Sequence, residues 1–421
     1  MPRPGLLSRL PVLAYRDFRL LLADRFLAPA SFAFSLVGVA FAVLDVTGST
    51  ADLSYVLAAQ IAPALIFALA GGVIADRIAP QRVIVAANLM IAFGEGGFGL
   101  LVLTGHPRLW QMIALETVTG SGMAVFYPAS QALLPRLVPD ALLQEASALS
   151  RLVMNGAQMG GAAIAGAFVA VAGPGWALAL CGGGMVATVP VLLSIRAGGE
   201  GRTAGSSMLR ELRDGWSEFI SRRWLWVIVA QFSVVMACWY GGFQVLGPVV
   251  AKHYLGGPAA WGAVTASDAT GLVIGGLISL RFAPRRPIRF AALSGGACAL
   301  SPLSLAARLP LLAVCAAALT LGVAIEIMMV QWTLALARNI PAGKLARVSS
   351  YDILGSVLAM PAGALAAGPL AGAIGLRPAE YCAAALTLAA SALALLPREV
   401  RRLGAGKSAE PSLAVSGAIA E

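Results

Sequence analysis

Charged side chains within long apolar stretches are the residues of this chain with the clearest potential for chemistry. An ionised group in hydrocarbon is costly, so such a residue normally faces a partner or a water-filled cavity, or takes part in a proton relay. The pattern therefore predicts a pathway for a polar solute, for protons, or for both. The candidates are Asp24, Arg25, Glu95, Glu116, Arg151, Asp268 and Glu326.

Depth along the apolar segments distinguishes these candidates. At about 1.5 Å per residue, Glu95 falls near mid-depth and is equally compatible with a structural pair. Asp268 and Glu116 fall roughly a third of the way in from one face, and Arg151 a similar distance in from the other. Asp24 and Arg25 are adjacent, so they point about 100° apart on a helix. For these two, the alternative is an interfacial pair that reaches into the headgroups.

Aromatic and amide side chains accompany the charges. Trp239, Tyr240, Phe243 and Gln244 follow one another within a single apolar segment, and Asn155 comes one turn after Arg151. Apolar walls with a few polar groups suit a small-molecule site. For any single aromatic residue, a position in the core or facing lipid is the simpler interpretation.

The elements that must position these residues are membrane helices. Of 421 residues, 59% are hydrophobic and 12% are charged, and a soluble fold with these proportions would expose large apolar patches. A helix needs about 20 apolar residues to cross the hydrocarbon. We therefore expect an all-α integral membrane protein with twelve spans, at 18–46, 52–75, 83–104, 109–134, 143–172, 175–195, 224–250, 260–281, 288–306, 310–337, 348–373 and 378–397.

The distribution of basic residues predicts the topology. With the N-terminus inside, 24 of the 30 Lys and Arg residues lie in cytoplasmic segments, and only Arg108, Lys252, Arg308 and Arg377 lie outside. The positive-inside rule then places both termini in the cytoplasm. The basic residues form short clusters between apolar segments, which argues against nucleic-acid binding. The five cysteines lack metal or disulfide spacing.

An internal repeat divides the chain into two halves. The stretch 71–82 returns as 275–286 with seven of twelve positions identical, and 134–139 has a weaker echo at 336–341. Six helices repeated in the same orientation is the plan of many secondary transporters, with the site between the halves. The expected units are an N-terminal bundle (1–195), a cytoplasmic linker with an amphipathic helix (196–223), a C-terminal bundle (224–398) and a flexible tail (399–421).

The first copy of the repeat resembles the signature Gly-x-x-x-Asp-Arg-x-Gly-Arg-Arg of the major facilitator superfamily. Gly72, Asp76, Arg77 and Arg82 match it, while Ala79 and Pro80 depart from it. The resemblance implies the major facilitator fold, with two six-helix pseudo-symmetric bundles and a cavity lined by the first, fourth, seventh and tenth helices. It also implies a gating latch, in which Asp76 faces the N-terminal end of the eleventh helix.

Short sequence motifs indicate a particular group within this superfamily. Residues 126–139 and 345–350 resemble the exporter group that includes the enterobactin exporter and the macrolide efflux proteins. The helix-four motif of drug/proton antiporters has an arginine where this chain has Glu116. Their helix-five Gly-Pro motif appears here as residues 155–161, without a proline.

Together these features predict a secondary transporter of the bacterial inner membrane. We expect proton-coupled efflux of an amphipathic small molecule, such as an antibiotic, a secondary metabolite or a siderophore, by a monomer without cofactors. A solute importer of the same fold is the alternative within transport, and a non-transporting membrane sensor or enzyme is the alternative from another class. The sequence has no phosphate-binding Gly-x-x-x-x-Gly-Lys-Ser/Thr loop, which argues against an ATP-driven pump. It also shows no catalytic triad or metal cluster that would favour an enzyme.

Overall fold

The computed structural model describes residues 11–75, 79–105, 107–196, 220–281, 284, 286–340 and 342–402. Asp76 and Arg77 of the signature lie outside these residues. So do most of the predicted linker, with its amphipathic helix, and most of the predicted tail.

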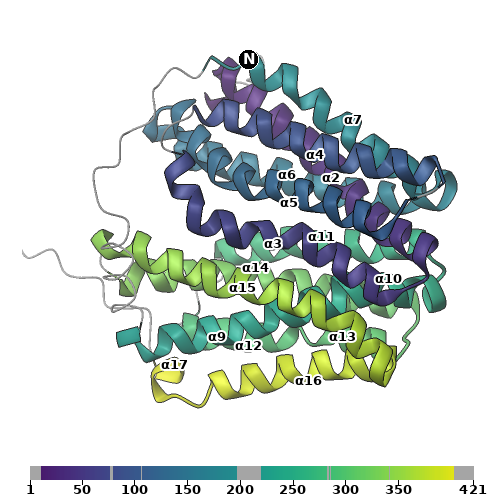
Figure 1. Cartoon of the computed structure of the whole chain (residues 1–421). Helices are drawn as coiled ribbons and strands as arrows, with labels where there is room; N and C mark the ends of the chain where they lie inside the picture. The colour runs from purple at the N-terminus through teal and green to yellow at the C-terminus, as the bar shows by residue number, and fades with distance from the viewer. Residues whose placement is uncertain are drawn as a thin grey trace, which may run out of the picture.

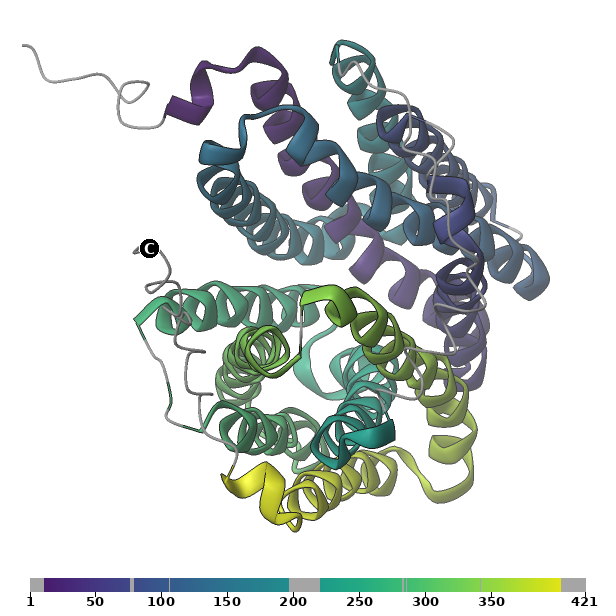
Figure 2. The ribbon, with the colours of Figure 1, turned by 90° about the vertical axis from the view of Figure 1, so that its left-hand side faces the viewer.

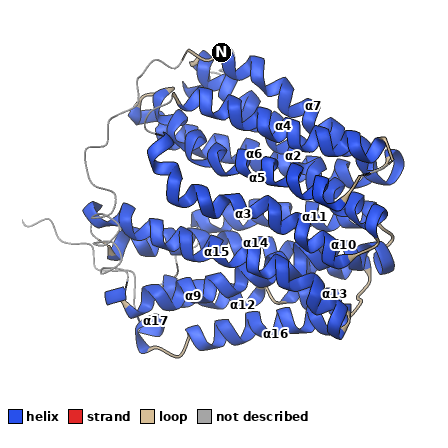
Figure 3. Cartoon of the chain, viewed as in Figure 1, coloured by secondary structure: helices blue, strands red, loops and turns tan. Residues whose placement is uncertain are grey.

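Throughout the described ranges, every regular element is a helix (Figure 3). A bilayer offers no water to backbone N–H and C=O groups, so a spanning segment must satisfy them internally. The described helices form twelve long helical rods, some of which combine several consecutive helices. Each predicted membrane segment corresponds to one of these rods. The largest shift is at the start of the eleventh rod, predicted at 348 and observed at Ala342. By length and composition, eight of the described helices are long and apolar enough to cross a membrane.

The first six rods are single helices: α2 (Arg16–Thr47), α3 (Thr50–Ala75), α4 (Pro80–Leu103), α5 (Leu109–Leu133), α6 (Leu143–Ala172) and α7 (Pro174–Leu193). The short turns η1 (Pro11–Ala14), η2 (Leu134–Arg136) and η3 (Asp140–Leu142) flank them.

The second six rods are less regular. The seventh runs without a break through α9 (Arg223–Cys238), the π-helix η4 (Trp239–Leu246), α10 (Gly247–Val250) and the π-helix η5 (Ala251–Leu255). The ninth combines α12 (Pro287–Ala297) with α13 (Leu300–Ala306). The other rods are α11 (Pro258–Arg281), α14 (Leu311–Asn339), α15 (Ala342–Ile374) and α16 (Leu376–Ala394), followed by the short α17 (Arg398–Arg402).

The rods form two bundles, one from each half of the chain (Figures 1 and 2). In the N-terminal bundle α2 packs on α6 and α7, while α4 packs on α5 and α7 and α3 packs on α5. The C-terminal bundle repeats this pattern, with α9 on α15 and α16, α12 on α14 and α16, and α11 on α14. The predicted pair of pseudo-symmetric six-helix bundles is confirmed, and α3–α15 and α6–α11 form the main contacts between them.

Six short turns close the end of the molecule opposite the termini, which we call the turn side. The other end, where the described chain begins and ends, is the terminus side. Each of the six turns contains a residue with a positive φ angle, which reverses the chain within a few residues. These residues are Gly48, Gly105, Gly173, Gly256, Arg308 and Gly375.

A polar clamp recurs at equivalent places in the two bundles. In the N-terminal bundle Asn88 of α4 donates to Thr188 Oγ1 of α7 at 2.7 Å and to Asp24 Oδ1 of α2 at 3.4 Å. In the C-terminal bundle Gln231 of α9 donates to the carbonyl of Ala292 on α12 at 2.9 Å and to Ser391 Oγ of α16 at 3.0 Å. Both clamps join the first, third and sixth helices of a bundle, which supports the duplication independently of the sequence repeat.

Small residues bring the bundles together on the turn side. A Cβ atom added to Gly166 of α6 would stand 2.5 Å from Gly262 Cα of α11. One added to Gly368 of α15 would stand 2.6 Å from Ala51 Cα of α3. Lys252 Nζ adds an ion pair to Asp45 Oδ1 at 2.6 Å, joining η5 to α2. The turn side is therefore closed in this structure.

Small residues recur every four positions in α15 and α6, but they mediate close packing only in α15. Gly355 and Gly363 of α15 pack closely against α9, with no room for a Cβ atom. Gly156 and Gly160 of α6 instead have nothing within 4 Å of an added Cβ atom. Their four-residue spacing is regular but no helix packs against that position, so in this structure they do not mediate close packing.

This contrast on α6 gives a prediction. Gly166→Ala should lower the apparent melting temperature of the purified protein, because overpacking against Gly262 costs about 1–3 kcal/mol. Gly160→Ala, on the same helix, should match or exceed the wild type, because alanine favours a helix by about 0.5–1 kcal/mol. Thermal unfolding of both variants in one detergent checks this. Equal stability of the two variants would show that the bundles do not depend on this contact.

Candidate functional site

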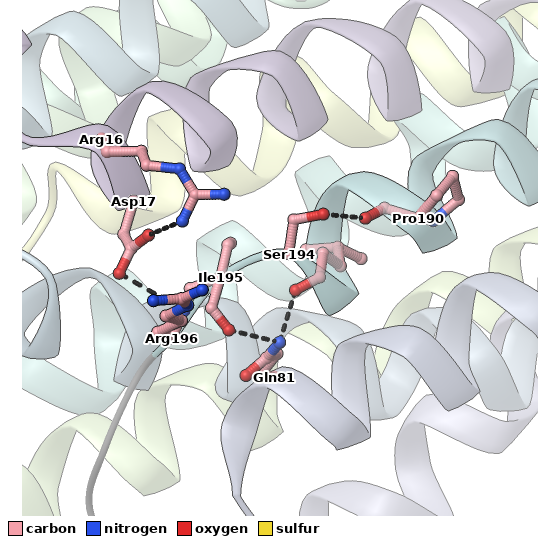
Figure 4. Close-up of polar contacts among 8 residues, drawn as sticks. Arg16, Asp17, Gln81, Pro190, Ser194, Ile195 and Arg196 are labelled. Atoms are coloured by element: carbon pink, nitrogen blue, oxygen red, sulfur yellow. Dashed lines mark hydrogen bonds and ion pairs between the residues drawn. The ribbon is translucent and has the colours of Figure 1, made fainter.

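The described residues of the signature lie on the terminus side of the N-terminal bundle. Gly72 is in the last turns of α3, and Arg82 is exposed in the first turn of α4. Beside it, Gln81 Nε2 donates to the carbonyls of Ile195, at 2.9 Å, and Leu192 (Figure 4). Gln81 thereby satisfies carbonyl groups at the C-terminal end of α7.

The same region holds the first residue of the linker. Asp17, in the first turn of α2, accepts a hydrogen bond from the backbone N–H of Arg196 at 3.3 Å and lies 3.7 Å from Arg16 Nη1 (Figure 4). The chain therefore leaves the N-terminal bundle from a point fixed to the start of α2.

Asp24 and Arg25 lie within the N-terminal bundle and not at its surface. Asp24 is fully buried and forms part of the polar clamp through Asn88. Arg25 is 8% exposed, and its Nη2 donates to the carbonyl of Ser130 on α5 at 3.1 Å. Their burial argues against the interfacial alternative.

Glu95 and Glu116 occupy the centre of the N-terminal bundle, and both are fully buried. Ser35 Oγ of α2 donates to Glu95 Oε1 at 2.7 Å, and Gln60 Nε2 of α3 donates to Glu116 Oε2 at 2.7 Å. The two carboxyl groups interact electrostatically with each other. The second oxygen of each, Glu95 Oε2 and Glu116 Oε1, is buried without a hydrogen-bond partner. Four helices thus converge on a site with two acids.

Arg151 and Glu326 place opposite charges on opposite bundles. Arg151 of α6 is exposed, and Glu326 of α14 is half-buried and interacts electrostatically with it. Asn155 lies eleven residues before Gly166, and therefore on nearly the same face of α6 as the contact with α11. Where the bundles face each other on the terminus side, the structure thus presents a cation, an amide and an anion.

The helix-seven residues lie mainly in the core of the C-terminal bundle. Phe243 is 1% exposed and stacks at 4.9 Å on Trp261, while Trp239 and Phe243 line a small internal cavity between α9, α13, α14 and α16. Tyr240 is buried, and Gln244 is partly buried. This placement favours the core interpretation for Trp239 and Phe243. Asp268 is also partly buried, with Oδ1 lacking a partner.

Four polar residues of these sites were missed at the sequence level. Ser35 and Gln60 are uncharged and stand out only through their contacts with the acids. Asp352, whose Oδ2 accepts from Trp332 Nε1 at 2.7 Å, and Glu380, fully buried with both oxygens lacking partners, lie close to the ends of apolar segments. Because of these positions, Asp352 and Glu380 resemble residues at the membrane boundary. Their charge nevertheless makes both of them candidates for the pathway.

The part of the chain that the structure describes contains no group of three His, Cys, Asp or Glu side chains that could hold a metal ion. In the described structure, the two bundles meet through glycine contacts. Carboxyl groups are buried inside a bundle, and opposite charges lie on the two bundles. Such a site can hold protons and polar groups of a solute.

Comparisons with known proteins agree with this architecture. The family model described as Major Facilitator Superfamily matches residues 26–351. Macrolide efflux protein A of Streptococcus pyogenes is 23% identical over 250 residues, which cover 58% of this chain and 60% of that protein. Macrolide efflux protein A of Enterococcus faecalis is 24% identical over 224 residues, covering 51% and 68% respectively. The matched stretch thus spans under two thirds of the streptococcal relative.

Solved transporter structures share the fold at low sequence identity. A mutant form of the nucleoside transporter NupG has a TM-score of 0.77 at 11% identity, covering 90% of this chain and 99% of that one. A bacterial homolog of the human lysosomal transporter Spinster, in an inward-facing and unoccupied conformation, has a TM-score of 0.69 at 14% identity, covering 90% and 97%.

The position of Arg25 gives a second prediction. Arg25→Ala should abolish the transport of at least one substrate at unchanged membrane abundance, because it removes a buried cation beside α5. Arg19→Ala, which alters an exposed arginine nearer the start of α2, should leave transport unchanged. Transport by both variants, normalised to protein in the membrane, checks this. If both variants behave alike, Arg25 has no special role in the pathway.

Proposed function

Because the chain belongs to the Major Facilitator Superfamily, we propose that it is a secondary active transporter that exports an amphipathic small molecule in exchange for protons. The observation that carries the proposal is the placement of charge. Glu95 and Glu116 are fully buried inside one bundle, and the opposite charges of Arg151 and Glu326 interact electrostatically from two bundles. A structural scaffold does not need charged groups at these places, and they are costly in a membrane.

Alternating access is the mechanism that we propose. The two bundles rock against each other around the glycine contacts of α6 with α11 and of α3 with α15. In this structure the turn side is closed by Asp45 and Lys252, so the described state would open toward the terminus side. The opposite state requires this ion pair to separate, and an exposed pair of this kind costs only about 0–1 kcal/mol to break.

Export and an amphipathic substrate are supported by the relatives named macrolide efflux protein A. Arg25, Arg151, Asn155 and Glu326 form the part of the proposed pathway that can contact a polar group of the substrate. Of the further candidates, Asp24, Glu116 and Asp268 can serve proton movement, and Tyr240, Gln244, Trp239 and Phe243 can shape the apolar part of the site. We assign them these roles as proposals.

The proposal includes a location and a gate. The basic residues of the terminus side support a cytoplasmic orientation of that side, and we assign the protein to a bacterial inner membrane. In this proposal 1–195 and 224–398 are the moving units, 196–223 is their linker and 399–421 is a tail. Gly72, Asp76, Arg77 and Arg82 would form the gating latch on the cytoplasmic side. An importer of the same fold remains the rival hypothesis, because NupG, which shares the fold, is described as a nucleoside transporter without a stated direction.

Transport by energised everted vesicles tests the direction and the coupling. Vesicles that contain the protein should accumulate a macrolide or another amphipathic antibiotic when respiration acidifies their interior, and an ionophore that collapses the pH gradient should release it. Vesicles without the protein provide the background, and the exposed variant Arg19→Ala provides the matched positive control. Protein-dependent uptake into whole cells, without accumulation in everted vesicles, would establish an importer instead.

A further inference from the structure

The neighbouring acids Glu95 and Glu116 have no acidic counterparts at the equivalent positions of the C-terminal bundle, whose own fully buried acid, Glu380, lies elsewhere on α16. The repeat offset of 204 residues between Gly71 and Gly275 carries Glu95 to Ala299, beside Cys298, and Glu116 to Thr320, beside Leu321. Cys298 and Leu321 line the small internal cavity of the C-terminal bundle, with Cys238, Ser301 and Thr387. The second copy of the fold therefore has uncharged residues at these two positions, although Asp268 interacts electrostatically with Cys298. The helix packing does not require acids at the two equivalent positions.

The surroundings of Glu95 and Glu116 supply hydrogen-bond donors but no cation. The uncharged groups around the pair are the hydroxyls of Ser35 and Thr119 and the amide of Gln60, together with the thiol of Cys181 and the phenol of Tyr240, which interact electrostatically with the acids. These come from α2, α5, α3, α7 and η4 respectively. None of them carries a positive charge, so nothing in this set compensates two buried negative charges.

The hydrogen bonds themselves leave room for one more donor. Ser35 and Gln60 each donate to one oxygen of an acid. Glu95 Oε2 and Glu116 Oε1 make no hydrogen bond, and neither does the hydroxyl of Thr119, which stands beside Glu95. A buried carboxylate oxygen without a partner is costly, as other buried unpaired ions are. Two like charges at one buried site add mutual repulsion to that cost, and this repulsion favours the protonation of one of the two carboxyl groups.

We propose that Glu95 and Glu116 together bind one proton, so that the pair forms a proton site with a single negative charge. The proton bonds to one of the two free oxygens and provides the donor that the pair lacks. The remaining charge is stabilised by Ser35 and Gln60. The proton is taken from water on one side and returned to water on the other, so no further reactant is needed.

The location of the pair connects the site to the movement of the bundles. Gln60 lies on α3, the helix that packs against α15 of the other bundle, and Tyr240, which interacts electrostatically with Glu116, belongs to the C-terminal bundle. Rocking of the bundles therefore changes the surroundings of Glu116 more than those of Glu95. The exchange of this proton for substrate rests on the proposed function, whereas the presence of the proton does not.

Infrared spectroscopy of the purified protein tests the proposal without any transport. The carbonyl stretch of a protonated carboxyl group absorbs apart from the bands of an ionised carboxylate. At neutral pH, the wild type minus Glu95→Gln/Glu116→Gln difference spectrum should show the loss of one protonated acid and one carboxylate. Asp24→Asn, which alters another fully buried acid in the same bundle, calibrates the intensity of one carboxyl group.

Two outcomes would overturn the proposal. Loss of carboxylate bands alone would mean that both acids are ionised, and loss of two protonated acids would mean that the pair is neutral. If the double variant does not fold, dicyclohexylcarbodiimide, which modifies protonated carboxyl groups in apolar sites, is applied to the wild type. Modification of either Glu95 or Glu116, but not both in one molecule, is expected, and the absence of modification at both counts against the site.

The transport readout separates this proposal from the proposed function. Each single variant, Glu95→Gln or Glu116→Gln, should remove the dependence of efflux on the pH gradient. A protonated acid in the spectrum without gradient-driven efflux would contradict the proposed function and leave the proton site intact. Efflux driven by the gradient, with both acids ionised, would contradict the proton site and leave the proposed function intact.

Discussion

In the hydrocarbon of a bilayer, a polar group must find its partner inside the protein, and the rest of this structure depends on that constraint. Backbone groups meet it by forming helices throughout the described spans. Side chains meet it through clamps that join three helices, as Asn88 and Gln231 do in the two bundles. With no hydrophobic force between helices in lipid, close approach at small residues such as Gly166 and Gly262 supplies the packing.

The two halves satisfy this constraint differently, and that difference bears on function. Both bundles repeat the same helix pairs and the same type of clamp, but only the N-terminal bundle, among the described residues, buries a pair of neighbouring acids at its centre. At the corresponding level of the C-terminal bundle, Cys298 and Leu321 line a small cavity. Duplication explains the shared architecture, whereas the acids represent a departure that costs stability. This asymmetry would let one bundle carry a proton while both share in binding and releasing a solute.

Much of the fold follows from the sequence because membrane helices leave a strong signal. Apolar length located the twelve rods, and the repeat at Gly71 and Gly275 gave the division into bundles. The candidate sites were harder to predict, because a helix shows its charge but not the direction in which the side chain points. Trp239 and Phe243 lie within a bundle and not between bundles, and the space beside Gly156 could not be inferred from its spacing. Gln60 acquires its importance only from contact with Glu116.

Distances between the bundles at both ends test the rocking mechanism most directly. Spin labels at Arg82 and Arg338 report on the terminus side, and labels at Val46 and His253 report on the turn side; all four positions are exposed. The accessible cysteines Cys315 and Cys382 are first replaced by serine. When pH is changed or an exported compound is added, double electron–electron resonance should show one distance shortening as the other lengthens. Fixed distances under conditions that support transport, or changes in the same direction at both ends, would contradict alternating access by these two bundles.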